Sequence, residues 1–477
     1  MTPAAPLRSD GAYAALRRGM TAVGPKVVTA AHPLAASAAL GALERGGNAF
    51  DAVVAACLME TIALPMKCGL AGDLVALFRR GEGPFEALVS IGGGARAIAD
   101  GATLARTGPG SIGVPGAPHG YSLLAGMGRL PLGMLAEPAI QAAHLGVPWR
   151  DVELGYLREG QALLARYSPD NPYLRDGELP AEGSLRMLPE LGGLLEQFVE
   201  HRANLFHGPL GTDIARHVAA LGGILTAEDF LQKPGRIAPP LATRLPGGAQ
   251  LLTTPYPTTG PQLADALASL GPRPRVATPD IIETMRQKTR LKGRAARDGG
   301  TSVVGCADDD GNVAIVLHSN SFPQFASGVV LPSGLILNNR PGRGFDLDAP
   351  AGSPAAPGAG KTPPTTLHAW SLTEGARSLI GATPGGVNQL PWNFQVLGRL
   401  LAGETVEDAV LAPRWALDAA GRLSAEPGAD TGARRYDTEA EPFGLRSVMQ
   451  VIAPAANGAG HKAVADPRTG ALALAGF

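Results

Sequence analysis

Residues 299–321 read GGTSVVGCADDDGNVAIVLHSNS, and this stretch decides the fold that we expect. After two glycines, the run 301–304 moves into apolar residues, and a second apolar run follows at 313–317. Between them, residues 308–312 are polar and include a glycine. This pattern is typical of a β-hairpin with a polar turn. We therefore predict two paired strands, with Thr301 at the start of the first.

A threonine in this position can become catalytic if the bond between Gly300 and Thr301 is broken. Its hydroxyl and a free α-amino group would then lie on one residue. An α-amino group with an ordinary pKa of about 7.7 to 8.0 can accept the hydroxyl proton at neutral pH, so no separate base is needed. Gly-Gly-Thr is also common in ordinary turns, so the rest of the chain must distinguish the two interpretations.

Composition and charge favour small-molecule chemistry. The chain has 477 residues, of which 45% are hydrophobic and 17% charged, so it can bury one large core or two moderate ones. The formal net charge is -1, and lysines and arginines are scattered along the sequence. This distribution argues against binding to nucleic acid or to an anionic membrane.

Targeting and cysteine patterns give two further expectations. The first twenty residues contain no apolar core of signal-peptide length, and no later run approaches the roughly 20 apolar residues of a membrane span, so we expect a cytoplasmic protein. The three cysteines, Cys57, Cys68 and Cys306, contain no CxxC pair. They suggest neither a disulfide framework nor a zinc site, and we expect no metal and no organic cofactor.

The N-terminal part predicts a helix pair followed by a glycine-rich loop. A helix is expected over about 33–45, and Asn48 and Asp51 have the spacing of a capping box at the start of a second helix. The loop 67–73 contains two glycines that would let the backbone approach a pocket, and a strand is expected at 74–78.

The sequence of the middle of the chain predicts mainly structural elements without catalytic residues. Helical periodicity covers roughly residues 118–220, and Thr226 starts a short capped helix. Residues 273–298 form the most basic and least regular segment, which resembles an exposed linker able to lie over a site before cleavage. Residues 349–360 are of low complexity and are expected to be flexible.

A glycine pair near residue 385 suggests an anion site. Gly385 and Gly386 follow an expected strand and precede an expected helix over 389–401. Two successive glycine N–H groups at a helix start can bind an oxyanion, although a plain strand-to-helix turn has the same sequence pattern.

Taken in order, several segments resemble the γ-glutamyltranspeptidase family of N-terminal-nucleophile hydrolases, and the resemblance covers nearly the whole chain. The resemblance implies an α/β (α+β) fold, a four-layer αββα sandwich, without cofactors. It also implies a single domain whose residues 1–300 form a large subunit and 301–477 a small one. The matching segments are AAHPLAASAALGALERGGNAFDAVVAA (30–56), GLAGDLVALF (69–78), SIGVPGAPHGY (111–121), LPLGMLAEPAIQAA (130–143), LTAEDF (225–230) and TTPYPTTGPQ (253–262).

The resemblance assigns roles to individual residues. The family cleaves itself before a threonine whose segment ends in Asp-Gly-Asn, and the count from Thr301 to Asn312 fits without a gap, so Thr301 is the implied nucleophile. Ser319 falls where the family has a hydroxyl residue that supports the nucleophile. The implied oxyanion site is Gly385 with Gly386. In the segment 360–366, Thr365 and Thr366 replace the family's paired hydroxyl residues at the substrate site.

The substrate-recognition residues depart from the family pattern. The family's carboxylate-binding arginine has become Gly94, and Arg96 is either a shifted substitute or a solvated surface arginine. After Asn338 and Asn339 the family has acidic and amide side chains, whereas this chain has Arg340, which would repel an ammonium group. We therefore expect an acyl group without a free α-amine, carrying a carboxylate or oxo-acid end held by Arg340, with Asn339 also at the substrate site.

Two further points concern the hairpin itself. His318 either borders the pocket or points outward from its strand. Ser302 and Val303 replace the family's Thr-His after the nucleophile, which puts the efficiency of cleavage in doubt.

The sequence thus predicts an autocatalytically cleaved threonine hydrolase or acyltransferase acting on a small-molecule amide. It is most similar to the divergent cytoplasmic acylase and amidase members of the family. Two alternatives stay open: a genuine γ-glutamyl transferase or glutathione hydrolase, and an uncleaved, non-catalytic member used for binding or as a scaffold. The sequence leaves open whether the acyl group goes to water or to an amine. The partners expected are a small-molecule amide substrate and, if the chain is cleaved, the large and small subunits of the same precursor; the sequence leaves the oligomeric state open.

Overall fold

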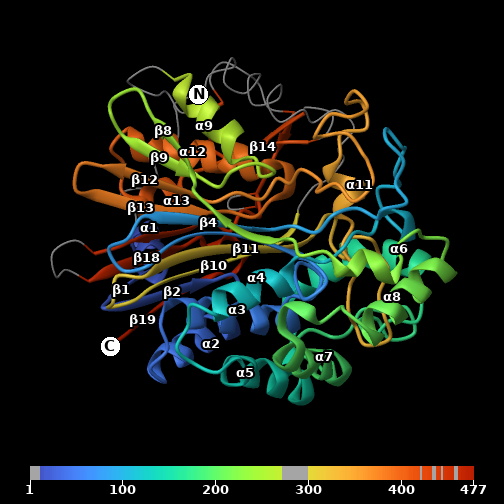
Figure 1. Cartoon of the computed structure of the whole chain (residues 1–477). Helices are drawn as coiled ribbons and strands as arrows, with labels where there is room; N and C mark the ends of the chain where they lie inside the picture. The colour runs from blue at the N-terminus through green and yellow to red at the C-terminus, as the bar shows by residue number, and fades with distance from the viewer. Residues whose placement is uncertain (1–10, 271–298, 419–421, 432–436, 442–443, 456–459) are drawn as a thin grey trace.

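The computed structural model describes residues 11–270, 299–418, 422–431, 437–441, 444–455 and 460–477. The expected linker 273–298 lies outside these residues. Within them, two seven-stranded sheets pack face to face between two layers of helices (Figure 1). The predicted αββα sandwich is therefore confirmed, and its antiparallel sheets make it an α+β fold.

The first sheet contains the predicted hairpin at its centre, and all its neighbouring strands are antiparallel. Its order is β19 (Leu472–Gly476), β2 (Lys26–Ala30), β10 (Gly300–Ala307), β11 (Val313–Ser321), β3 (Asp73–Arg79), β4 (Phe85–Ser90) and β7 (Gly235–Ala238).

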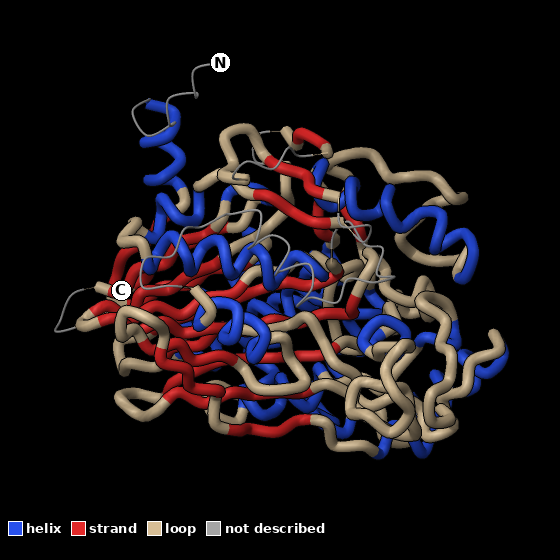
Figure 2. The backbone as a smooth tube through the Cα atoms, turned by 90° about the horizontal axis from the view of Figure 1, so that it is seen from above, coloured by secondary structure: helices blue, strands red, loops and turns tan. Residues whose placement is uncertain are grey.

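The second sheet is also antiparallel throughout and again mixes strands from both ends of the chain. Its order is β1 (Thr21–Gly24), β18 (His461–Ala465), β17 (Gln450–Ala453), β13 (Arg377–Ala382), β12 (Trp370–Glu374), β9 (Gln250–Thr253) and β8 (Leu241–Arg244). Figure 2 shows the strands gathered toward one side of the molecule, where the C-terminus lies, and many of the loops toward the other.

Helices cover both outer faces of the sandwich, as Figure 1 shows. Beneath the first sheet lie α2 (Pro33–Glu44), α3 (Ala49–Ala63), α4 (Ala117–Ala125), α5 (Leu132–Leu145) and α7 (Pro189–His201). On the second sheet lie α9 (Gly260–Ala268), α12 (Gln389–Leu401) and α13 (Val406–Leu411). The remaining elements are α1 (Gly11–Gly19), α6 (Asp151–Tyr167), α8 (Pro209–Ala220), α11 (Arg340–Gly344), the pair β5 (Val147–Pro148) and β6 (Leu185–Arg186), and β14 (Trp415–Leu417), β15 (Leu423–Ala425) and β16 (Thr438–Glu439).

The local signals in the sequence place most of these boundaries correctly. Helix α3 has the predicted capping box, in which Asn48 Oδ1 accepts the N–H of Asp51 and Asp51 accepts the N–H of Asn48. Helix α12 has the predicted bounds. The capped turn after Thr226 is a 3-10 helix, Ala227–Leu231, rather than an α-helix. No helix among the described residues is long and apolar enough to cross a membrane.

The hairpin is buried on both faces. Every residue of β10 and β11 is buried. Because side chains alternate along a strand, Val304 packs toward α2 and α3, whereas Val303 and Leu317 pack between the two sheets. Thr301 has the same parity as Val303, so its side chain faces the space between the sheets.

The turn of the hairpin also caps a helix from the first half of the chain. One oxygen of Asp308, Oδ2, accepts the N–H of Ala49 at 2.7 Å, at the start of α3. The other, Oδ1, accepts the N–H groups of Asp310 and Asn312 inside the turn. The Asp308 side chain therefore joins the hairpin to helix α3.

We predict that Asp308→Ala lowers the free energy of unfolding by about 2 kcal/mol, because buried amides lose their acceptor. Urea unfolding of the purified protein measures this loss. The neighbouring Asp309→Ala is the control, because this side chain is 55% exposed and makes only a 3.6 Å ion pair with Lys26. Equal effects of the two substitutions would contradict the capping role.

Candidate active site

Thr301 lies at an irregularity in the hairpin. Gly300 pairs with Ser321 and Thr301 pairs with Ser319, so Asn320 is the extra residue of a β-bulge. The bulge is held by the glycine-rich loop, because Asn320 donates from its main chain to Lys67 O at 2.8 Å and from its side chain to Pro65 O at 3.0 Å. The bulge lies opposite the Gly300 to Thr301 bond.

Ser319 links the Thr301 hydroxyl to the preceding peptide bond. Its Oγ lies 2.9 Å from Thr301 Oγ1, donates to the Gly300 carbonyl oxygen, and accepts the N–H of Ser321 at 2.9 Å. A serine hydroxyl has one proton, and here that proton goes to Gly300. The Thr301 hydroxyl must therefore donate to Ser319. The side chain of Thr301 is thus hydrogen-bonded and only 2% exposed.

The two glycines before helix α12 lie against the segment that precedes Thr301. A Cβ atom on Gly299 would be 2.4 Å from the main-chain nitrogen of Gly386, so the two backbones touch. Gly385 and Gly386 have φ angles of 136° and 56°, which favour glycine. The predicted oxyanion residues therefore lie within contact distance of Gly299, two residues from Thr301.

The two threonines of the segment 360–366 are placed differently. Thr365 is 3% exposed, and its Oγ1 accepts the N–H of Leu367 at 3.2 Å. The hydroxyl of Thr366 lies 3.5 Å from the side-chain nitrogen of Gln389, the first residue of α12. The Thr366 side chain therefore approaches the helix that follows Gly386, while Thr365 supports its own loop.

Arg340 is buried and bound to an acidic residue that sequence reasoning had not selected. Its Nε lies 2.7 Å from Asp73 Oδ2, with the two side chains 2% and 0% exposed. Burial raises the pKa of the Asp73 carboxyl above its usual value, and the Arg340 guanidinium opposes that increase. The signal in the sequence was an aspartate at the start of an otherwise apolar strand, directly after the glycine-rich loop.

The two asparagines before Arg340 fix its main chain. Asn338 Nδ2 donates to Ala71 O at 2.9 Å and to Gly113 O at 3.0 Å, while its Oδ1 accepts the N–H of Arg340. Asn339 Nδ2 lies 2.9 to 3.0 Å from three carbonyl oxygens, those of residues 106, 322 and 326. Its amide nitrogen thus holds the backbone, while its Oδ1 is buried without a hydrogen-bond partner.

The family's arginine position and its expected substitute lie on a loop after β4. Gly94 is buried, and a Cβ there would lie 2.6 Å from Ile98, so an arginine would not fit without movement. The side chain of Arg96 is exposed, and its main-chain N–H donates to Asp229 Oδ1 at 2.9 Å. Arg96 is therefore a surface side chain on a fixed backbone.

His318 points away from Thr301, into the helical layer. Its Nε2 lies 2.7 Å from Glu60 Oε2 and its Nδ1 lies 2.7 Å from the Tyr121 hydroxyl. Cys68 lies close enough to His318 and Glu60 for the three to hold a metal ion. However, both ring nitrogens are already hydrogen-bonded, and burial raises the pKa of the Cys68 thiol well above its usual value. The cluster resembles a closed hydrogen-bond network more than a metal site.

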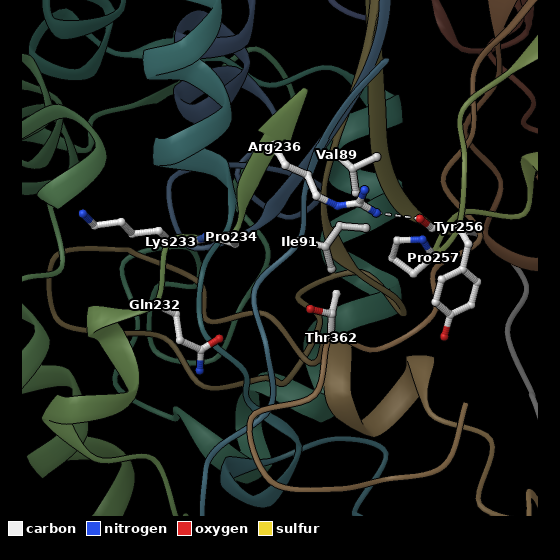
Figure 3. A pocket seen from close by; sticks show the side chains of 9 residues that line it. All are labelled: Val89, Ile91, Gln232, Lys233, Pro234, Arg236, Tyr256, Pro257 and Thr362. Carbon is white, nitrogen blue, oxygen red and sulfur yellow. Dashed lines mark hydrogen bonds between the residues drawn. The ribbon is translucent and has the colours of Figure 1, made fainter. Parts of the chain in front are cut away.

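A pocket of about 400 Å³ opens between the end of β4, the segment 232–236 and the loop at Tyr256. Ile91 lines it, and the next residue, Gly92, donates its N–H to Asp73 Oδ1 at 3.1 Å. Figure 3 shows Arg236 reaching across to the Tyr256 carbonyl, which it binds at 2.8 Å. The lining residues are Val89, Ile91, Gln232, Lys233, Pro234, Arg236, Tyr256, Pro257 and Thr362.

The two-sheet sandwich has the fold of the N-terminal-nucleophile hydrolases, a class of amide-cleaving enzymes. Within this class, the family model described as gamma-glutamyltranspeptidase matches residues 35–273 and 273–475. The chain therefore belongs to the γ-glutamyltranspeptidase family.

The names of individual relatives describe several different activities. The chain is 27% identical over 455 residues to an oxamate amidohydrolase proenzyme of Klebsiella pneumoniae, covering 82% of this chain and 85% of the relative. It is 27% identical over 447 residues to the glutathione hydrolase-like YwrD proenzyme of Bacillus subtilis, covering 82% and 84%. In fold, it is similar to a cephalosporin acylase from Bacillus halodurans, with a TM-score of 0.82, 23% identity, and 95% and 96% of the two chains covered.

We predict that Gly299→Ala lowers the free energy of unfolding by about 1 to 3 kcal/mol, because its Cβ would collide with the Gly386 backbone. Urea unfolding measures the change. Gly193→Ala in α7 is the matched control, since nothing lies within 4 Å of its added Cβ and the helix should gain up to about 1 kcal/mol. A stable Gly299→Ala protein would mean that the two backbones are not in contact.

Proposed function

We propose that this protein is a self-processing amidohydrolase whose nucleophile is Thr301. The contact between Thr301 Oγ1 and Ser319 Oγ carries the proposal, because it places the hydroxyl in a proton path to the peptide bond before it. Relatives described as proenzymes support the same conclusion.

In the first stage, Thr301 Oγ1 attacks the Gly300 carbonyl carbon. Ser319 receives the Thr301 proton and gives its own proton to the Gly300 carbonyl oxygen. The C–N bond then breaks as the proton on the former carbonyl oxygen passes to the nitrogen, the C=O bond forms again, and Gly300 is left as an ester on Thr301 Oγ1. Water hydrolyses this ester, which releases Gly300 as a carboxylate and Thr301 as a new N-terminus.

In the second stage, the free α-amino group of Thr301 takes the hydroxyl proton as Oγ1 attacks the substrate amide. The N–H groups of Gly385 and Gly386 stabilise the negative charge on the former carbonyl oxygen. The leaving amine departs with a proton, and water resolves the acyl-enzyme. Transfer to a second amine would use the same intermediate.

The acyl group is proposed to carry a carboxylate rather than an ammonium group. Arg340 is buried and is bound to Asp73, and Asp73 pairs with Ser319 in the first sheet. A guanidinium in this position attracts a carboxylate and repels an ammonium group. One relative is named for oxamate, which is an amide that bears a carboxylate, and this name supports the proposed acyl group.

Intact mass under denaturing conditions tests the nucleophile. Wild-type protein should give two chains, 1–300 and 301–477, whereas Thr301→Ala should stay whole. Thr301→Ser keeps a hydroxyl and should still be cut. Ser319→Ala removes the proton path and should slow cutting by about 100-fold or more, which is within the range for loss of one acid-base group. A wild-type chain that stays uncut on incubation would favour the non-catalytic alternative.

Substrate preference tests the acyl group. The cleaved enzyme should hydrolyse oxamate, measured as released ammonia, with a kcat/KM at least about tenfold above that for γ-glutamyl-p-nitroanilide, which carries an ammonium group. Thr301→Ala is the blank for both reactions. A preference for the γ-glutamyl compound would support the glutathione hydrolase alternative and remove the carboxylate argument.

A further inference from the structure

The two peptide planes that carry the N–H groups of Gly385 and Gly386 are held through their carbonyl oxygens. A trans peptide bond points its C=O and its N–H in opposite directions, so a bond to one fixes the direction of the other. The plane of the Gly386 N–H is fixed by the main chain, because Gly385 O accepts the N–H of Asn388 at 2.9 Å. The plane of the Gly385 N–H is fixed by a side chain, because Pro384 O accepts the hydroxyl of Thr383 at 3.0 Å. The direction of the Gly385 N–H therefore depends on one threonine hydroxyl.

The hydrogen bonds of the Thr383 hydroxyl have only one possible assignment. Its Oγ1 lies 3.3 Å from the main-chain nitrogen of Val448, and a main-chain N–H can only donate. The hydroxyl proton therefore goes to Pro384 O, which can only accept. The Thr383 side chain is 0% exposed, so bulk water does not compete for either bond.

The main-chain donor at Val448 is anchored by a buried carboxylate. The residues on either side of it both bind Asp466 Oδ2, Ser447 through its hydroxyl at 2.8 Å and Met449 through its main-chain N–H at 3.4 Å. The same carboxylate forms ion pairs of 2.9 and 3.0 Å with two buried arginines, Arg414 and Arg468. The segment 447–449 is therefore a fixed support for the loop that contains the two glycines.

A second contact sets the position of this loop relative to the strand of the nucleophile. Gln450 pairs with Ala382, the last residue of β13, and its side chain crosses from the second sheet to the first. Its Nε2 donates to Val303 O in β10 at 2.7 Å, two residues after Thr301. The chain around residue 450 therefore holds both the glycine loop and the strand that contains Thr301.

The glycine N–H groups do not hold the bond that is cut during self-cleavage. The Gly300 carbonyl oxygen accepts from Ser319 Oγ. Among the residues that the structure describes, neither Gly385 N–H nor Gly386 N–H donates to an acceptor. The direction of these two N–H groups should therefore matter for the second stage of the reaction and not for the first.

We infer that Thr383 is a positioning residue for hydrolysis of the substrate amide. Its hydroxyl holds the Pro384 carbonyl, which keeps the Gly385 N–H in the direction that stabilises negative charge on the substrate oxygen. Without this bond the plane between Pro384 and Gly385 can rotate, because glycine tolerates a wide range of φ. The inference rests on the proposed function for the role of Gly385, but the direction of the peptide plane can be measured without turnover.

The test compares self-cleavage with amide hydrolysis in Thr383→Val, which keeps the branched shape and removes the hydroxyl. Self-cleavage is followed by intact mass at a series of times after cell-free synthesis. Hydrolysis is measured with oxamate or γ-glutamyl-p-nitroanilide, whichever wild-type protein hydrolyses faster. Self-cleavage should stay within about threefold of the wild-type rate, whereas kcat for hydrolysis should fall by about 10- to 100-fold with KM nearly unchanged.

Two further variants separate positioning from general damage. Thr383→Ser keeps the hydroxyl and should restore kcat to within about threefold of wild type. Thr253→Val is the matched control, because this threonine is also buried at a strand end of the second sheet, but its hydroxyl has no partner among the described residues. It should leave both rates unchanged. An unchanged kcat in Thr383→Val would overturn the inference, and so would an equal loss of self-cleavage and hydrolysis.

Crystal structures of wild type and Thr383→Val distinguish the inference from the proposed function. The plane between Pro384 and Gly385 should be rotated in the variant, and an unrotated plane would overturn the inference. If the plane rotates but wild-type protein hydrolyses neither amide, the alignment by Thr383 stands and the catalytic proposal fails. If wild-type protein hydrolyses an amide and the variant is equally active, the catalytic proposal stands and this inference fails.

Discussion

The pairing of β10 with β11 is the constraint on which the rest of the molecule depends. Both strands are buried along their whole length, and they separate a helical core on one face from the inter-sheet core on the other. Most side chains of the two strands are therefore apolar on both faces. Of the polar ones, Thr301, Ser319 and His318 have specific hydrogen-bond partners, whereas the hydroxyls of Ser302 and Ser321 are buried without one.

These polar exceptions divide by face. Thr301 and Ser319 point between the sheets, where the glycines before α12 and the Asp73–Arg340 pair also lie. His318 points the other way and is hydrogen-bonded within the helical layer to Glu60 and Tyr121. A change of one residue in register would exchange the two sets, so the site depends on the same alternation that builds the core.

The parts of the structure that the sequence predicts well are those whose signal is local. The capping box of Asn48 and Asp51, the helix 389–401 and the turn 308–312 each depend on residues within a few positions of one another. The contact of Asp73 with Arg340 joins residues 267 positions apart, and no local pattern encodes it. The sequence leaves the direction of His318 open for the same reason, because which face of a strand packs against helices is decided only when distant elements assemble.

Strand order has a consequence for a chain divided after residue 300. Strand β2 comes from the first part, yet it is hydrogen-bonded on one edge to β10 and on the other to β19, both from the second part. The pairs β3–β11, β1–β18 and β9–β12 also join the two parts, so separating the two products would break ladders in both sheets. The folded products should therefore stay associated on dilution, but because unfolding of the cut molecule releases two chains, its unfolding midpoint should rise with protein concentration, whereas that of the uncut chain should not.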